Sequence, residues 1–324
     1  MSPTPTPPKY TVHTTPPPST LSYLTGCVTS TIFASTYLLT TPYILFSLYS
    51  ISQRRIIPAL PFVLSALIPS LHSTWVTKNL LGPMCGYFNY SEIREYSDSS
   101  RSADFKNGKS YILAAQPHGV ISFCGMCSAS YCIDEFRLIK TAAASVVTMV
   151  PILKHVMGVF GLIDAGGKNL KEHIKKGGAE GSVVIYIGGI AELFKSSRKE
   201  ERLYLSKRKG FIKLALTTGA DIIPLYLLGN TDTLTVVKNG PLATLSRKMG
   251  VSITYFWGLF NTPIPRPSQM VYVRGRPLGI TKMDNPKQED IDRWHEVYCK
   301  EVERLFETYK GTCKGYENKK FYID

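Results

Sequence analysis

The sequence predicts an α/β fold: a mixed sheet flanked by helices, preceded by an apolar N-terminal hairpin that we expect to be embedded in a membrane. From about residue 105 onward, short apolar runs with β-branched or aromatic residues alternate with helical patterns. Residues 10–53 carry no charged side chain apart from any protonated His13. Hydrophobic residues make up 44% of the 324 residues, so the chain can bury a large core.

The N-terminal part divides into a tail and two apolar stretches. Residues 1–20 are rich in Pro, Ser and Thr, which predicts a disordered tail. We expect residues 21–80 to form the membrane hairpin. Its first arm, Leu21–Ser50, exceeds the roughly 20 residues that a membrane-spanning helix needs, and its second arm, Ile56–Thr77, is also uncharged.

Prolines and arginines leave the details of this hairpin open. Pro58, Pro61 and Pro69 interrupt the second arm, so one or both arms can instead be buried or re-entrant helices. Arg54 and Arg55 lie in the short link, which favours a cytosolic position for the link. The membrane topology therefore stays open.

Residues 81–324 are expected to form one catalytic domain. Its last helix has the clearest signals: Asn285 suits the N-cap, Pro286 the first helical position, and Gln288 a capping box. Apolar residues recur at helical spacing up to Phe306. Two further helices are predicted over Asn169–Lys176 and Phe211–Thr218, and four strands over Ser110–Ala115, Ser182–Ile187, Asp221–Leu228 and Met270–Val273.

A polar turn directly follows the first of these strands. Pro117 restrains Gln116 to an extended conformation, and His118 has the side chain best suited to general base catalysis near neutral pH. The N–H of Gly119 could donate to an oxyanion. For a single histidine that follows a strand, a hydrogen-bonded structural role is more common than a catalytic one, and this alternative stays open for His118.

A glycine pair follows the strand Ser182–Ile187 in the same way. Gly188 and Gly189 allow a tight turn, after which Glu192 stands near the same edge of the sheet as His118. Glu192 could orient His118 or bind a hydroxyl group. A GGxxE pattern by itself is only weakly specific.

Residues 195–213 are strongly basic, and a helix is expected to begin within them. Arg208, Lys209 and Lys213 surround its N-terminus, an arrangement that suits phosphate groups such as those of coenzyme A. The alternative is a solvated surface run. The net charge of +14 fits an anionic partner in either case.

Several other functions are disfavoured. The basic stretch lacks interleaved aromatic residues for base stacking, so we expect no nucleic acid partner. GxGxxG, GxSxG and Walker A motifs do not occur. Cys124 and Cys127 form a lone CxxC whose nearest histidine is His118, so we expect buried thiols and no metal site.

The order and spacing of these motifs resemble the diacylglycerol acyltransferase type 2 family, which includes monoacylglycerol and wax acyltransferases. The resemblance runs from the apolar hairpin to about Lys310. It rests on Pro117–Gly119, Gly188–Glu192, Arg208–Ala215, Arg274–Leu278 and Pro286–Asp292.

The resemblance implies a glycerolipid acyltransferase-like fold and an acyl-CoA:diacylglycerol O-acyltransferase that makes triacylglycerol. Acyl-CoA would be a substrate, and no cofactor is expected. The enzyme would be a multi-pass protein of the endoplasmic reticulum membrane. The resemblance also allows a location at the lipid droplet surface and a homo-oligomer. The alternatives are a monoacylglycerol or wax-alcohol acyltransferase and a non-catalytic lipid-binding membrane protein.

The chain departs from the family pattern at a few positions. The histidine motif begins with Gln116 where the family has His or Glu, so the catalytic role carries over to His118 alone. Related glycerolipid acyltransferases have a His-x4-Asp pair, whereas this chain has Phe123 at the Asp position. Glu192 is therefore our candidate partner for His118. Lys168 and Asn230 also differ from the residues common in the family.

Overall fold

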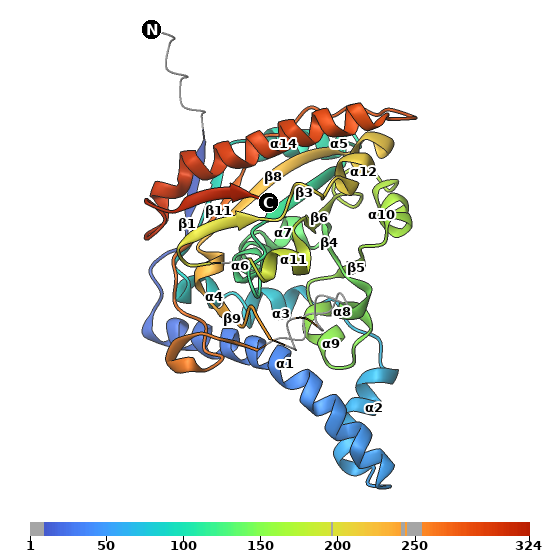
Figure 1. The fold of residues 1–324 in the computed structure, drawn as a ribbon, viewed down its shortest axis with the longest axis vertical. Coiled ribbons are helices and arrows are strands. Elements are labelled where there is room, and N and C mark those ends of the chain that lie inside the picture. The colour runs from blue at the N-terminus through green and yellow to red at the C-terminus, as the bar shows by residue number, and fades with distance from the viewer. Residues whose placement is uncertain (1–9, 196, 241–243, 245–254) are drawn as a thin grey trace.

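The computed structural model describes residues 10–195, 197–240, 244 and 255–324 (Figure 1). Within these residues an eight-stranded mixed sheet runs in the order β1-β2-β11-β8-β3-β6-β4-β5. The strands are β1 Thr11–Thr14, β2 Tyr90–Arg94, β3 Tyr111–Gln116, β4 Lys140–Ala143, β5 Leu162–Asp164, β6 Val183–Tyr186, β8 Asp221–Leu228 and β11 Met270–Arg274.

The four predicted strands are confirmed and lie next to one another in the order β11-β8-β3-β6. β3 is parallel to both of its neighbours, β6 and β8, whereas β11 is antiparallel to β8. Every residue of β3 and β8 is buried, which explains their continuous apolar sequences. The structure therefore has the α/β fold with a mixed sheet that the sequence predicts.

Side chains of β3 alternate between two hydrophobic cores, one on each face of the sheet. Tyr111 and Leu113 belong to the core beneath α1 (Thr20–Ser52), α4 (Met84–Tyr87) and α6 (Phe123–Tyr131). Ile112 and Ala114 belong to the opposite core. That core lies beneath α10 (Gly167–Ile174), α12 (Gly210–Thr218) and α14 (Gln288–Tyr309), and Figure 1 shows α12 and α14 on the far side of the sheet from α1.

Helix α14 is confirmed, but its start differs from the prediction. The helix begins at Gln288 with Lys287 at the N-cap, later than the predicted Asn285 and Pro286. The Asp290 carboxylate accepts the Lys287 N–H at 3.1 Å. Asp290 rather than Gln288 therefore satisfies the first backbone donor of the helix.

The expected apolar hairpin consists of one long arm and one short arm. The long arm, α1, is long and apolar enough to cross a membrane. The second arm is shorter than predicted: after η1 (Ile57–Ala59), α2 (Leu60–Leu67) has only 8 residues and α3 (Thr74–Asn79) follows separately. At 1.5 Å per residue, α2 is about 12 Å long and does not span a bilayer by itself.

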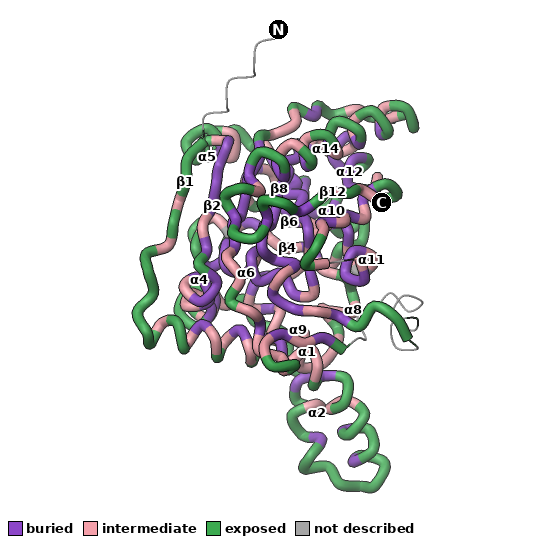
Figure 2. The backbone as a smooth tube through the Cα atoms, turned by 60° about the vertical axis from the view of Figure 1, so that its left-hand side comes forward, coloured by how far each residue is buried: buried purple, intermediate pink, exposed green. Residues whose placement is uncertain are grey.

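The end of α1 projects from the domain together with α2, as Figures 1 and 2 show. Apolar side chains of this projecting part face outward: Leu45 of α1 is 62% exposed, Ile57 of η1 85% and Leu67 of α2 77%. The first half of α1 instead packs on the domain, where Phe33 and Ala34 join the core.

Part of the segment predicted as a disordered tail forms an edge strand. Residues 1–9 lie outside the described residues, but β1 pairs antiparallel with β2, with Thr11 opposite Arg94. The remaining elements are α5 Asp98–Lys106, α7 Ile133–Phe136, α8 Ser145–Met149, α9 Leu153–Gly158, α11 Gly189–Leu193, β7 Glu200–Leu203, η2 Asn230–Asp232, β9 Thr235–Val236, β10 Phe256–Trp257, η3 Leu259–Asn261, η4 Lys310–Thr312 and β12 Lys320–Ile323.

Candidate active site

Three loops meet where parallel strands end. β3 leads into the histidine turn at Pro117, β6 leads into the glycine pair at Gly188, and β8 leads into Gly229. These three strands are parallel neighbours, so their carboxyl ends lie at the same edge of the sheet. The sheet therefore brings His118 and Glu192 together although they are 74 residues apart in the chain.

The imidazole of His118 has one nitrogen engaged by its own turn. Nδ1 lies 3.0 Å from the carbonyl oxygen of Gly119. A carbonyl oxygen only accepts hydrogen bonds, so in the neutral ring Nδ1 carries the hydrogen and Nε2 keeps its lone pair. Burial lowers the pKa of His118 below its usual 6.5, which favours this neutral form. The ring thus has the state that a general base requires.

Glu192 holds the main chain of the histidine turn rather than the imidazole. Its Oε1 accepts the backbone N–H of His118 at 2.7 Å, and its carboxylate also accepts the backbone N–H of Tyr204. The side chain is fully buried, and burial raises its pKa to about 7 despite these hydrogen bonds. Glu192 therefore positions His118 through the backbone.

Asn230 closes the turn from the third loop, and the sequence alone did not identify it as a site residue. Its Nδ2 donates to the carbonyl oxygens of Pro117 at 3.2 Å and His118 at 2.5 Å, and its Oδ1 accepts the N–H of Cys124 at 3.1 Å. The available signal was a turn with glycine, Gly229-Asn230, directly after a buried strand, because the other two loops also contain glycine directly after a strand.

Gly119 fits this closed turn because it has no side chain. Its φ of +63° lies in the left-handed region, and a Cβ there would be 2.9 Å from Nδ2 of Asn230. Gly189 has a φ of +57°, and a Cβ at Gly188 would lie 2.1 Å from a carboxylate oxygen of Glu192. Both predicted glycine turns therefore need glycine for close packing at the site.

The three predicted phosphate-binding residues separate into two groups. Arg208 lies beside the glycine turn, with its guanidinium 3.4 Å from the carbonyl oxygen of Gly188. Lys209 forms an ion pair at 2.7 Å with Asp292 of α14. Lys213 is exposed on α12. Of the three residues, only Arg208 lies near the turns that hold His118 and Glu192.

Two other cations of residues 195–213 are paired with a carboxylate. Lys195 and Arg202 both contact the side chain of Asp324, at 2.7 Å and 2.9 Å. Such pairs reduce the positive charge that this surface offers to a phosphate group.

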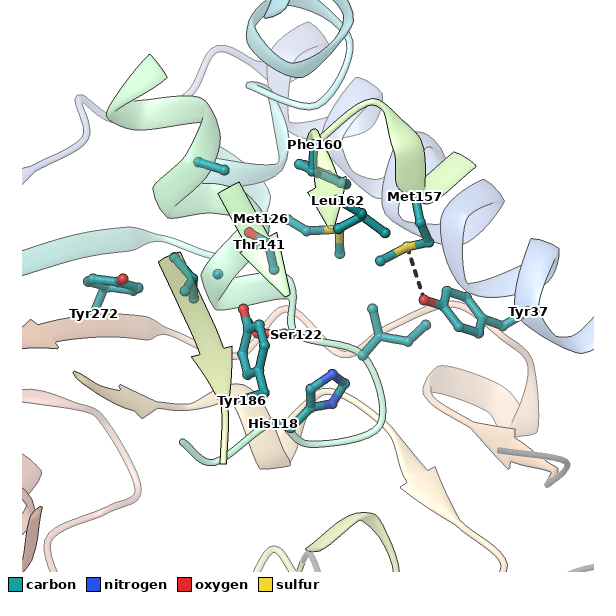
Figure 3. Close-up of a pocket in the computed structure, with 14 residues that line it drawn as sticks. Tyr37, His118, Ser122, Met126, Thr141, Met157, Phe160, Leu162, Tyr186 and Tyr272 are labelled. Carbon is teal, nitrogen blue, oxygen red and sulfur yellow. Dashed lines mark hydrogen bonds between the residues drawn. The ribbon is translucent and has the colours of Figure 1, made fainter. Parts of the chain in front are cut away.

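His118 borders an apolar cavity that reaches α1 (Figure 3). The empty space of the cavity and its open mouth together is about 580 Å³. Tyr37 of α1 donates a hydrogen bond to Sδ of Met157 at 3.0 Å across one wall. The lining residues are Tyr37, His118, Ile121, Ser122, Gly125, Met126, Ala129, Thr141, Met157, Phe160, Leu162, Val184, Tyr186 and Tyr272.

The described part of the chain holds no group of three or more His, Cys, Asp or Glu side chains that could bind a metal ion. Cys124 and Cys127 are fully buried within α6, where burial raises the pKa of both thiols. They pack in the core beneath the sheet.

Comparisons with known proteins show which family the chain resembles. A family model described as diacylglycerol acyltransferase matches residues 71–322. Diacylglycerol O-acyltransferase 2 of Dictyostelium discoideum is 31% identical over 67% of this chain and 71% of its own length. Human 2-acylglycerol O-acyltransferase 3 is 27% identical over 75% of this chain and 79% of its own length.

Among solved structures, the crystal structure of the 1-acyl-sn-glycerophosphate acyltransferase from Thermotoga maritima aligns with a TM-score of 0.42 and 11% identity, covering 88% of this chain and 97% of that one. The sequence matches identify this protein as an acyltransferase enzyme of the glycerolipid type. More specifically, the chain belongs to the diacylglycerol acyltransferase family.

Proposed function

We propose that the protein is an acyl-CoA:diacylglycerol O-acyltransferase in which His118 is the general base. The observation that carries this proposal is a half-buried, neutral imidazole at the border of an apolar cavity, with Nδ1 held by Gly119. Several relatives are named diacylglycerol O-acyltransferase 2, which supports diacylglycerol as the acceptor.

In this mechanism, Nε2 of His118 takes the proton of the acceptor hydroxyl as its oxygen attacks the thioester carbonyl carbon. The new C–O bond leaves an oxyanion. The N–H of Gly119 is a candidate donor to it, because this N–H has no acceptor within the part of the chain that the structure describes. The C–S bond then breaks, and the coenzyme A thiolate leaves and takes up the proton from the imidazolium. No covalent acyl-enzyme is needed.

The apolar cavity and α1 give lipid substrates a route to His118. Diacylglycerol stays within a bilayer, and an enzyme that acts on it gains from contact with the membrane. α1 is long and apolar enough to cross a membrane, and its residue Tyr37 lines the cavity. We propose that α1 anchors the protein in a membrane with the cavity open toward the lipid; the membrane is that of the endoplasmic reticulum, as the family resemblance implies, with lipid droplets as a second location.

Arg208 is our candidate for contact with the phosphates of coenzyme A. It is exposed, positively charged and adjacent to the Gly188 turn, so an acyl-CoA whose thioester lies at His118 can extend along it. Lys209 and Lys213 lie farther along the same helix N-terminus. They would add long-range attraction rather than direct contact.

A second acceptor class has its own support. Human 2-acylglycerol O-acyltransferase 3 matches as much of this chain as several of the diacylglycerol enzymes do, so monoacylglycerol is the main alternative acceptor. A wax alcohol would use the same base and the same cavity.

The proposal is tested in microsomes that express the full chain. Labelled acyl-CoA is offered with diacylglycerol, monoacylglycerol, a fatty alcohol or lysophospholipid in turn. We expect labelled triacylglycerol to be the main product. Monoacylglycerol or alcohol acylation in its place would change the acceptor but keep the mechanism, whereas no product with any acceptor would favour a non-catalytic lipid-binding protein.

A further inference from the structure

Beside His118, the apolar cavity contains a pair of hydroxyl groups. Oγ of Ser122 donates a hydrogen bond to the hydroxyl oxygen of Tyr186 at 2.8 Å. Both residues line the cavity, and Figure 3 shows the Tyr186 hydroxyl directed away from the imidazole, toward Ser122 and Thr141. The Tyr186 ring meets the His118 ring edge-on, with centroids 4.7 Å apart and an angle of 74°.

The Tyr186 hydroxyl has a hydrogen left to donate. It accepts from Ser122, and within the described residues it has no hydrogen-bond acceptor of its own. Burial raises the pKa of Tyr186 to about 12, so the hydroxyl stays protonated at neutral pH. A protonated hydroxyl in an apolar cavity is a donor that an oxygen atom of a bound lipid can satisfy.

Gly125 leaves room for this hydroxyl group because it has no side chain. A Cβ built on Gly125 would lie 2.0 Å from the Tyr186 oxygen and 2.9 Å from Oγ of Ser122. Gly125 is in the first turn of α6, where a larger residue would displace the tyrosine from Ser122. Strand, helix and turn thus hold the hydroxyl at one defined position in the cavity wall.

We propose that the Tyr186 hydroxyl donates a hydrogen bond to an ester carbonyl of the glyceride acceptor and so makes the enzyme prefer acyl glycerides. This inference rests on the proposed function and specifies its acceptor site. The hydroxyl points away from His118, which takes the proton of the reacting group. It is therefore placed for an oxygen a few atoms away from the reacting hydroxyl, and in a partial glyceride that oxygen is the carbonyl of a neighbouring ester.

The test compares two acceptors that differ only in their ester carbonyls. One is 1,2-dioleoyl-sn-glycerol and the other is its 1,2-dialkyl ether analogue, which keeps the free hydroxyl and both chains. For the wild-type enzyme we expect kcat/KM to be about three- to tenfold higher with the ester, the effect typical of one neutral hydrogen bond. Tyr186→Phe keeps the ring against His118 and should abolish this preference while retaining activity with the ether.

Two further variants separate the contact from a general effect on folding. Gly125→Ala keeps the hydroxyl but crowds it, so it should also reduce the ester preference. Thr141→Val removes another hydroxyl from the same cavity and should keep the preference. Because each preference is a ratio within one preparation, loss of folded protein cancels.

The outcomes distinguish this inference from the proposed function. A wild-type enzyme that acylates neither glyceride contradicts the proposed function itself. Equal activity of the wild type with ester and ether, or equal losses with both acceptors in Tyr186→Phe, overturns the inference and leaves the acyltransferase activity intact. An effect of Thr141→Val as large as that of Tyr186→Phe would overturn it as well.

Discussion

The carbonyl oxygen of Gly119 accepts the Nδ1 hydrogen of His118 across 3.0 Å, so the residue after the histidine fixes the tautomer of the ring. In many hydrolytic sites a carboxylate has this role. Here the carboxylate of Glu192 instead binds the backbone of the same turn. A backbone carbonyl carries no full charge, so it orients the imidazole without raising its basicity as strongly as a carboxylate would.

Removal of the base is the first prediction. His118→Ala should lower kcat about 100- to 10,000-fold, the usual contribution of general base catalysis. The measurement is acyl transfer by membranes that contain equal amounts of each variant. His13→Ala, in edge strand β1 and far from the cavity in sequence, is the control and should keep wild-type activity. Near-normal turnover of His118→Ala would contradict the mechanism.

Gly119→Ala tests whether the backbone of the turn matters. The φ of +63° is unfavourable by roughly 1–2 kcal/mol for a residue with a Cβ, and the new methyl group would press on Asn230. We expect at least a tenfold loss of activity, with membrane insertion and expression preserved.

The matched control for that change is Gly167→Ala. Gly167 begins α10, its φ is not positive, and a Cβ there would have no neighbour within 4 Å. This variant should be active and at least as stable as the wild type, because alanine favours the helix. Equal loss in both variants would mean that Gly119 has no special role.

The sequence predicted the central strands but not the edge of the sheet, for a physical reason. β3 and β8 are buried on both faces and are continuously apolar, which is a local signal. β2 contains Glu92 and Arg94, which are buried as an ion pair with each other, and Arg274 from a distant strand also pairs with Glu92. Burial through such long-range ion pairs leaves no apolar pattern to read.

The candidate site, like the sheet, was predictable only in part from the sequence. His118 and Glu192 were identified because each follows a readable strand in a turn with glycine. The contact of Asn230 with the carbonyl of His118 joins residues 112 positions apart, and the Nδ1 acceptor is a backbone atom. Neither contact has a local sequence signal, and both required the structure.

Glu192→Gln separates positioning from proton transfer. A glutamine Oε1 can still accept the His118 N–H, so we expect activity within about tenfold of the wild type. Glu192→Ala leaves that buried N–H without its acceptor, and we expect a larger loss. The measurement is kcat for both variants at pH 8. A Glu192→Gln variant as inactive as His118→Ala would instead make the carboxylate part of the proton transfer.

The same substitution tests the pH dependence of stability. Burial raises the pKa of Glu192 from 4.5 to about 7, so between these values the folded state binds a proton that the unfolded state has released. Its contribution to stability is therefore greatest below about pH 4.5 and falls as the pH rises to about 7, by on the order of 3 kcal/mol. In Glu192→Gln this loss is absent.

The check is thermal unfolding of both proteins in detergent from pH 5 to pH 8. Other titrating groups are shared, so they cancel in the difference between the two midpoints. We expect the wild type to lose stability relative to Glu192→Gln as the pH rises. Parallel curves would mean that burial does not raise the pKa of this carboxyl group.

The activity profile gives a separate pH prediction for His118. Burial lowers the pKa of the imidazole below 6.5, so the neutral base persists into more acidic solution than for an exposed histidine. In Glu192→Gln, where residue 192 does not titrate, the acid limb of kcat should lie below pH 6.5. A limb above that value would contradict a neutral, desolvated imidazole.

Salt dependence distinguishes the cations proposed to attract coenzyme A. Arg208 is exposed beside Gly188, whereas Lys209 is held by Asp292. Arg208→Ala should raise the KM for acyl-CoA several-fold at low ionic strength. It should also weaken the salt dependence of this KM, because one fewer contact between a cation and a phosphate is then screened by salt. Lys209→Ala, of equal charge change, should have a smaller effect on KM. If the KM of the wild type were independent of salt, or if Lys209→Ala had the larger effect, the acyl-CoA would not lie along the glycine turn.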